Sequence, residues 1–170
     1  NNGCGWFFKA CPDSFQKIAG SPFAYWVSQG VIRSFEESRR VSDVAETKSG
    51  MSTTDNVQFL RYWYEVPQSK IGFNFENAQT AAESNKKWFP YSKGGGYRKW
   101  FGNQEYVVNW QADGRDIREC IASDPAKQVG GRIVNENFYF KPGVGWSDLT
   151  SGRLSARVQD KGFLFDSVNP

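Results

Sequence analysis

Residues 86–101 read Lys-Lys-Trp-Phe-Pro-Tyr-Ser-Lys-Gly-Gly-Gly-Tyr-Arg-Lys-Trp-Phe. The stretch carries five lysine or arginine side chains and six aromatic ones, and it contains no aspartate or glutamate. Lysine and arginine bind polyanions by releasing counterions, and aromatic rings stack on bases, so this mixture is typical of a nucleic-acid-binding surface. The glycines at 94–96 interrupt any helix or strand and allow positive φ. The stretch therefore predicts two short strands joined by a flexible tip.

A second interpretation of the same stretch stays open. Aromatic residues on both sides of a glycine turn also pack the core of their own hairpin, and the lysines then lie on its solvated face. Composition alone does not separate the two interpretations.

The overall composition is that of a globular domain, with room for a piece of a neighbouring one. The chain has 170 residues, of which 16% are aromatic and 23% charged, and a net charge of +3 from 21 Lys and Arg against 18 acids. Such a small excess does not by itself indicate nucleic-acid binding. It matters that the excess is concentrated in residues 86–101.

The chain has three cysteines, Cys4, Cys11 and Cys120, and no histidine. An odd count without regular spacing argues against a disulfide framework and predicts a reducing, cytoplasmic location. The lack of histidine excludes Ser-His-Asp and Cys-His catalysis, and a four-ligand zinc site would need a carboxylate. No membrane span or signal peptide is expected from the hydrophobic pattern. Because the chain starts without methionine and ends at Asn169-Pro170, we expect it to be a segment of a longer protein.

Hydrophobic periodicity and turn residues predict the order of elements. Ser21 is expected to cap a helix over residues 23–37, with Pro22 in its first turn and an apolar stripe that packs on the core. After residue 40 the pattern changes to strands and turns. A short helical turn ending at residue 59 is expected behind a cap at 53–55. Further helices are expected at 78–87 and 115–123, and strands at 5–9, 41–46, 61–66, 71–75, 105–110, 138–140, 144–146, 154–158 and 163–165.

These elements predict an α+β fold with a mixed or antiparallel sheet and about three helices, in two parts, 1–40 and 41–170. Common cofactor motifs are missing. Neither the Gly-x4-Gly-Lys-Ser/Thr phosphate loop nor Gly-x-Gly-x-x-Gly occurs. Carboxylate pairs such as Glu36-Glu37 are expected to be solvated helix residues.

Residues 87–103, Lys-Trp-Phe-Pro-Tyr-Ser-Lys-Gly-Gly-Gly-Tyr-Arg-Lys-Trp-Phe-Gly-Asn, are followed by Val-Val-Asn-Trp at 107–110. Residues 138–147 read Phe-Tyr-Phe-Lys-Pro-Gly-Val-Gly-Trp-Ser, and Ser-Ala-Arg follows at 155–157. This ordered set resembles adenine-specific DNA methyltransferases of the BREX phage-defence type, the PglX group, and their type IIG restriction-modification relatives. The resemblance covers most of the chain.

In that family a catalytic methyltransferase domain precedes a target-recognition domain. The resemblance implies that residues 1–40 are the tail of the former and residues 41–170 a DNA target-recognition domain. The family's Asn/Asp-Pro-Pro-Tyr/Phe loop and its S-adenosylmethionine-binding glycine loop are absent here. S-adenosylmethionine is therefore expected in the parent enzyme, and no cofactor in this chain. The expected partners are double-stranded DNA and the methyltransferase domain of the same polypeptide.

The resemblance also implies roles for individual side chains. Phosphate contacts are expected from the cations Lys86, Lys87, Lys93, Arg98 and Lys99. Candidate base-reading residues are Asn103, Gln104, Arg153 and Arg157. Turn capping by the first two and surface charge on strands for the arginines remain the alternatives. Tyr97 and Trp100 are expected to lie against the DNA backbone or an unstacked base, and core packing remains the alternative for Trp100.

Two other functions remain open. The aromatic surface is alternatively a docking module for the methyltransferase domain or another defence component, with no direct DNA contact. Carbohydrate binding on aromatic platforms fits the Trp and Tyr content but not the unpaired cysteines.

Overall fold

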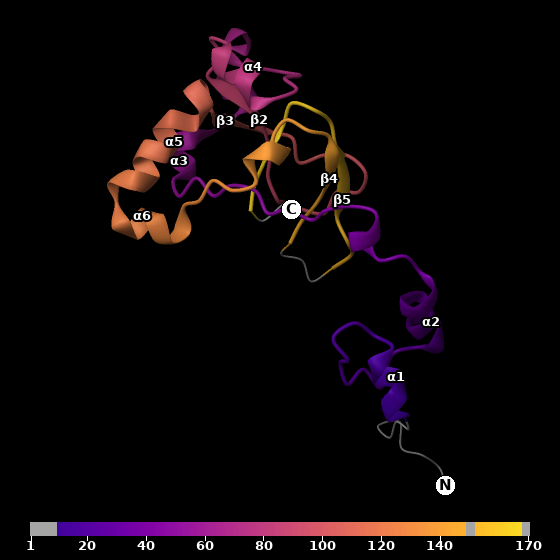
Figure 1. The fold of residues 1–170 in the computed structure, drawn as a ribbon. Coiled ribbons are helices and arrows are strands. Elements are labelled where there is room, and N and C mark those ends of the chain that lie inside the picture. The colour runs from indigo at the N-terminus through magenta and orange to yellow at the C-terminus, as the bar shows by residue number, and fades with distance from the viewer. Residues whose placement is uncertain (1–9, 149–151, 168–170) are drawn as a thin grey trace. The chain divides into compact units, whose positions relative to one another are not determined.

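The computed structural model describes residues 10–148 and 152–167 and divides the chain into two compact units, Asn1–Glu46 and Thr47–Pro170 (Figure 1). The predicted α+β class is confirmed. The described residues form six α-helices, a four-stranded mixed sheet and a two-stranded sheet, which is more helices than expected. The strand expected at residues 5–9 lies outside the described residues.

The first unit contains α1 (Pro12–Gln16), α2 (Gln29–Glu37) and the 3-10 turn η1 (Val41–Asp43). The prediction of a helix from residue 23 was wrong at its start. Ser21 takes a left-handed conformation with φ 47°, and Ser28 caps α2 instead, its Oγ accepting from Val31 N at 3.4 Å. The strand expected at 41–46 was also wrong, because the Asp43 carboxylate accepts the Arg40 amide at 3.0 Å and closes a tight turn.

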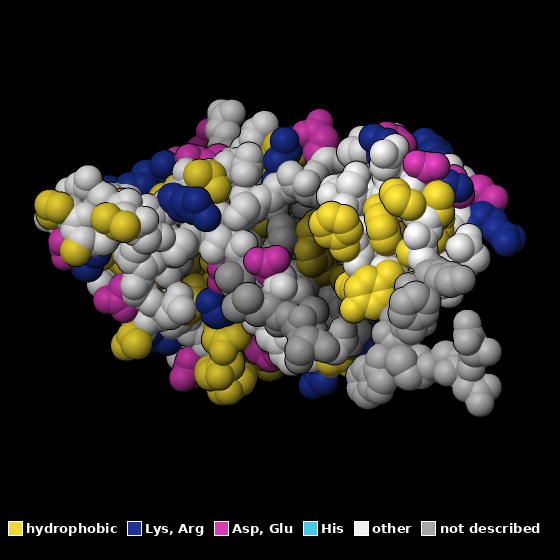
Figure 2. All heavy atoms as spheres, turned by 90° about the horizontal axis from the view of Figure 1, so that it is seen from below, with side chains coloured by type: hydrophobic (Ala, Val, Ile, Leu, Met, Phe, Trp, Pro, Cys, Tyr) yellow, Lys and Arg dark blue, Asp and Glu magenta, His cyan; other side chains and the backbone are white. Residues whose placement is uncertain are grey.

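The first unit buries little of its apolar surface. Of its described hydrophobic residues, Ile18 and Ile32 are buried, while Phe23 is 80% and Trp26 66% exposed. The expected packing of the whole apolar stripe on a core was therefore wrong. In Figure 2 hydrophobic side chains reach the surface in several separate groups among charged ones.

The second unit is built on a sheet with the strand order β1-β3-β2-β6. Strands β1 (Leu60–Tyr62), β3 (Tyr106–Asn109) and β2 (Trp88–Ser92) are antiparallel, and β6 (Leu164–Phe165) joins β2 in parallel. A separate antiparallel sheet pairs β4 (Gly143–Trp146) with β5 (Ala156–Gln159). Most of the strands expected after residue 100 are thus confirmed.

Local side-chain caps begin the helices of this unit. Asp55 accepts the Gln58 amide at 2.9 Å before α3 (Asn56–Phe59), and Asn77 accepts the Thr80 amide at 2.9 Å before α4 (Ala78–Glu83). Next come α5 (Gln111–Ser123), which opens with a left-handed turn at 112–114, and α6 (Pro125–Gly130). In Figure 1, α5 and α6 lie on the opposite side of this unit from β4 and β5.

Three expected strands are shortened or replaced. Strand β1 ends at Tyr62, whose amide donates to the Glu65 carboxylate at 2.7 Å and starts the 3-10 turn η2 (Trp63–Glu65). A second such turn, η3 (Gln68–Lys70), precedes Ile71, which forms one isolated bridge to Trp88 instead of a strand. The turn η4 (Glu136–Phe138) replaces the start of the strand expected at 138–140.

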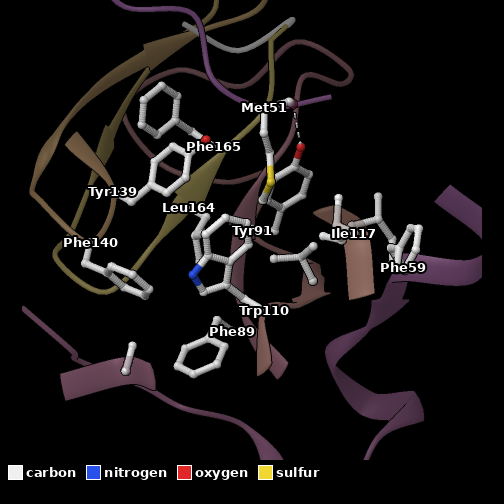
Figure 3. Packing of buried hydrophobic residues seen from close by; sticks show 13 residues of the cluster. Met51, Phe59, Phe89, Tyr91, Trp110, Ile117, Tyr139, Phe140, Leu164 and Phe165 are labelled. Atoms are coloured by element: carbon white, nitrogen blue, oxygen red, sulfur yellow. Dashed lines mark hydrogen bonds between the residues drawn. The ribbon is translucent and has the colours of Figure 1, made fainter. Parts of the chain in front are cut away.

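The core of the second unit is largely aromatic (Figure 3). Trp110, Tyr91, Phe89 and Phe140 are almost completely buried, and burying each such side chain contributes about 2 to 3 kcal/mol. The Tyr91 hydroxyl donates to the Met51 carbonyl at 3.1 Å, which ties the start of this unit to the sheet. Phe89 and Tyr91 of β2 are thus core residues, as the hairpin-core interpretation expected for that half of the stretch, while Trp88 is only partly buried.

Candidate nucleic-acid interface

The loop at residues 93–103 follows β2 and lies against the β4–β5 sheet. The Trp100 amide donates to the Ala156 carbonyl at 2.8 Å, and the Val158 amide donates to the Trp100 carbonyl at 3.0 Å. Trp100 thereby forms a single bridge beside β5, parallel to Arg157. The predicted second strand of a hairpin was wrong, since residues 97–101 form only this one bridge.

Two serines of the β4–β5 region fasten the first half of this loop. Ser155 Oγ accepts from the Arg98 amide at 3.1 Å and donates to the Arg98 carbonyl at 2.8 Å. Ser147 Oγ donates to the Gly95 carbonyl at 3.2 Å. Hydrogen bonds at three residues of the loop, Gly95, Arg98 and Trp100, hold it to the β4–β5 region, so the expected flexible tip is a fixed surface.

Arg157 lies beneath this contact and is only 3% exposed. Its Nη1 donates to Ser147 Oγ at 3.2 Å, to the Ser155 carbonyl at 3.0 Å and to Ser155 Oγ at 2.7 Å. Burial lowers the pKa of the Arg157 guanidinium, and the charge of Glu105 acts against that shift. Arg157 binds the same two serines that hold the loop, and it is not positioned at the surface where a base would be read.

Other predicted contact residues also have partners inside the chain. Lys93 Nζ pairs with the Asp166 carboxylate at 2.7 Å, with 24% and 8% of the two side chains exposed. Lys86 Nζ donates to the Ser69 carbonyl at 2.7 Å. Lys87 Nζ lies 5.6 Å from the centre of the neighbouring indole ring of β2. Lys86 and Lys93 thus bond to oxygen atoms within the chain, whereas the side chain of Lys87 has, among the described residues, only a ring contact of the kind that Lys99 also makes.

Asn103 is buried and left-handed, with φ 58°, and its Nδ2 donates to the Gly96 carbonyl at 3.1 Å. The turn-capping alternative describes this contact. The side chain of its neighbour Gln104 is partly exposed.

The exposed members of the predicted set lie on the loop and just before β5, together with Phe101, which was not among the predicted contacts. Tyr97 is half exposed, Trp100 is 66% and Phe101 68% exposed, and Lys99 Nζ lies 4.8 Å from the centre of the Trp100 ring. Core packing of Trp100, one of our two expectations, was therefore wrong. We call the exposed side chains of this region the tip surface. Its members are Tyr97, Arg98, Lys99, Trp100, Phe101 and Arg153.

A second exposed aromatic group was missed in the sequence because its residues were expected to continue a strand. The Tyr62 ring stacks on Tyr64 at 5.3 Å and on Tyr106 at 4.9 Å between ring centres, and the Trp63 ring meets Tyr64 edge to face. The Tyr106 hydroxyl donates to the Tyr62 hydroxyl at 3.2 Å, which raises the pKa of Tyr106 to about 12. The run Tyr-Trp-Tyr at 62–64 was the available signal.

The surface charge is mixed. On the face in Figure 2, Lys and Arg side chains lie among Asp and Glu side chains instead of forming one basic field. Within residues 10–148 and 152–167, no group of His, Cys, Asp and Glu side chains could hold a metal ion. No helix in those same ranges has the length and apolar character to cross a membrane.

No protein-family model matches the chain. The chain is similar to two curated proteins along nearly its whole length. It is 40% identical over 168 residues to the adenine-specific methyltransferase PglX of Lacticaseibacillus casei (strain Zhang), which covers 98% of the chain and 14% of that relative. It is 35% identical over 161 residues to the adenine-specific methyltransferase BrxX of Escherichia coli O9:H4 (strain HS), which covers 94% of the chain and 12% of that relative. The resemblance to this group is thereby confirmed.

Proposed function

The chain corresponds to a segment of the PglX and BrxX adenine-specific methyltransferases, and we propose that its second unit is a DNA target-recognition domain of such an enzyme. In this proposal the domain holds duplex DNA while a separate catalytic domain extrudes an adenine and methylates it. The chain spans only 12–14% of the length of these relatives. S-adenosylmethionine would therefore bind elsewhere in the parent enzyme.

The tip surface is the observation that carries this proposal. Two exposed cations, Arg98 and Lys99, accompany exposed aromatic rings on a loop that is hydrogen-bonded to β5, and a third exposed cation, Arg153, lies just before β5. Cations position a protein on phosphates, and exposed rings stack on bases. A fixed backbone lets these groups meet DNA without a large ordering cost. Asn103 and Arg157 support the surface from within, Lys93 pairs with Asp166, and Gln104 adjoins the surface in sequence.

The test is duplex binding as a function of salt. The triple variant Arg98→Ala, Lys99→Ala, Arg153→Ala removes the three exposed cations. Its control, Arg115→Ala, Lys127→Ala, Arg132→Ala, removes the same charge from α5, α6 and the segment that follows them. Fluorescence anisotropy with a random-sequence duplex measures both beside the unchanged chain, and circular dichroism checks folding.

We expect the slope of log affinity against log salt to fall by about 1 for each lost phosphate contact in the tip variant. The control variant keeps most of the slope because its charges lie on other elements. Equal losses in the two variants, or no binding by the unchanged chain, would refute the proposal.

For the first unit we propose docking to the rest of the methyltransferase. Phe23, Trp26 and Phe35 are exposed although the unit buries few hydrophobic residues of its own. Exposed apolar groups of this kind mark protein interfaces, and most of the relatives' length lies outside this match. Phe23→Ser with Trp26→Ser should weaken association with the separately expressed remainder of the enzyme. Unchanged association would contradict this assignment.

A further inference from the structure

Trp100 has a backbone conformation that its side chain does not favour. Its φ is 73°, in the left-handed region, where glycine and asparagine are the usual residues. Two nearby positions carry those types, since Gly102 has φ 125° and Asn103 has φ 58°. Trp100 gains little from burial in return, because two thirds of its surface is exposed. Neither backbone preference nor core packing explains a tryptophan here.

The backbone of Trp100 is held on both sides. Its amide donates to Ala156 and its carbonyl accepts from Val158, so β5 fixes the left-handed residue from its N–H and its C=O. A strained residue persists only where its surroundings determine the conformation, and such residues cluster at functional sites. The hydrogen bonds therefore hold an exposed indole in one place.

The neighbours of this indole are apolar at the centre and cationic at the side. Phe101 follows it and is equally exposed, and Val158, bonded to the Trp100 carbonyl, is exposed together with its cross-strand partner Val144. Arg98 and Lys99 precede it, and residues 84–104 contain no acid. A partner that fits this arrangement is apolar in the middle and anionic at the edges. Stacked bases between two phosphate backbones have that character.

We propose that Trp100, with Phe101 beside it, enters the base stack of bound duplex DNA as an apolar wedge. This inference rests on the proposed function and adds to it the distortion of the DNA. Apolar side chains inserted between base steps unstack and kink the duplex. Unstacking lowers the cost of extruding a base, which an adenine methyltransferase must do before transfer. Lys99, lying over the indole, then remains next to the phosphate that flanks the opened step.

The experiment uses a randomised duplex in which 2-aminopurine replaces every adenine of one strand. Anisotropy reports binding, and 2-aminopurine emission rises where bases unstack. Trp100→Gly and Trp100→Asn both suit a left-handed backbone, so both should fold with an unchanged or higher melting temperature. Trp63→Ala is the matched control, because Trp63 is another exposed tryptophan but lies on η2, away from the tip loop in the chain.

We expect the unchanged chain and the Trp63 variant to bind and to raise the emission. Both Trp100 variants should bind about ten-fold more weakly and, at saturating concentration, leave the emission at the level of free DNA. Binding by the unchanged chain without a rise, or a rise that survives in the Trp100 variants, overturns the wedge and leaves the proposed function standing. Failure of the unchanged chain to bind overturns both. A lower melting temperature in both Trp100 variants overturns the strain argument.

Discussion

Replacing Arg157 with methionine should detach the tip loop from its support. Methionine keeps much of the apolar volume of the side chain but donates no hydrogen bond. The change therefore removes the bonds from Nη1 to Ser147 Oγ, the Ser155 carbonyl and Ser155 Oγ. Those two serines in turn bind the backbone of Arg98 and Gly95. The loop should lose its order together with the buried network.

The magnitude follows from the geometry. Nη1 carries two hydrogens, so three contacts represent about two full hydrogen bonds, and a bond from a charged donor is worth about 1.5 to 3 kcal/mol. Part of this is offset because burying the guanidinium is unfavourable, as its lowered pKa shows. We expect the free energy of unfolding to fall by about 3 kcal/mol. For a unit of this size the melting temperature should drop by roughly 10 °C.

Urea denaturation measures the loss, and Arg153→Met serves as the control. Arg153 precedes the same strand but is exposed, so its replacement should change stability by less than about 0.5 kcal/mol. Selection from randomised duplexes then compares the preferred sequences of the variants. A stable Arg157→Met variant with an altered sequence preference would refute the structural role and make Arg157 a base-reading residue.

Two further predictions concern the aromatic and ionic contacts. In the folded chain the pKa of Tyr106 lies near 12, above its usual 10, so the bond to Tyr62 stabilises the fold below pH 10 and is lost as the pH rises toward 12. Tyr62→Phe should move this tyrosinate absorbance toward pH 10, and an unchanged titration would contradict the assignment. Lys93→Met should lower the free energy of unfolding by about 2 kcal/mol at neutral pH because Asp166 stays buried without its ammonium partner, whereas Lys99→Met should change it by less than about 0.5 kcal/mol. If urea denaturation shows the same loss of unfolding free energy in the Lys93 and Lys99 variants, the stabilising role of the Lys93–Asp166 ion pair is contradicted.

The elements that sequence analysis predicted correctly are those with strong local signals. Asp55 caps α3 as expected, and the right-handed part of α5 begins at Arg115, where the helix over 115–123 was expected to start. Strands β3 and β6 are short apolar runs bounded by polar or turn residues. In each case the deciding interactions lie within a few residues of one another.

The failures arise where two local signals compete. Ser21 and Ser28 are both good helix caps, and the sequence gives no reason to choose between them. The structure uses Ser28, and the left-handed backbone at Ser21 places residues 22–27 outside the helix. Likewise Glu65 caps a 3-10 turn and ends β1 although the residues before it favour a strand.

The candidate site was predicted only in part. The reason is that β5 buries its polar side chains and exposes an apolar one, the reverse of the usual pattern. Alternation in a strand normally places the apolar residues inside, but Arg157 and Gln159 are buried while Val158 is exposed. Two serines make this possible: Ser155 is a near neighbour of Arg157 in the chain, whereas Ser147 follows β4 and is brought to the arginine by the pairing of β4 with β5. Sequence patterns do not contain that information. The exposed cations of the tip could be found from composition, whereas the internal roles of Lys93 and Arg157 could not.

The internal contacts of Lys93 and Arg157 limit the number of cations that the tip surface can offer to DNA. In the proposed function, Lys93 and Arg157 release no counterions from DNA because they are paired or buried inside the unit, and the phosphate contacts of the tip surface are Arg98, Lys99 and Arg153. Three contacts predict a slope of log affinity against log salt of about −3. Such electrostatic binding is weak at physiological salt, so the proposed complex needs further affinity from stacking by the exposed rings or from the rest of the enzyme. Because the wedge places Trp100 in the base stack, affinity at high salt should depend on Trp100 more than on Lys99. An equal loss of affinity in the two variants at high salt would contradict this reasoning.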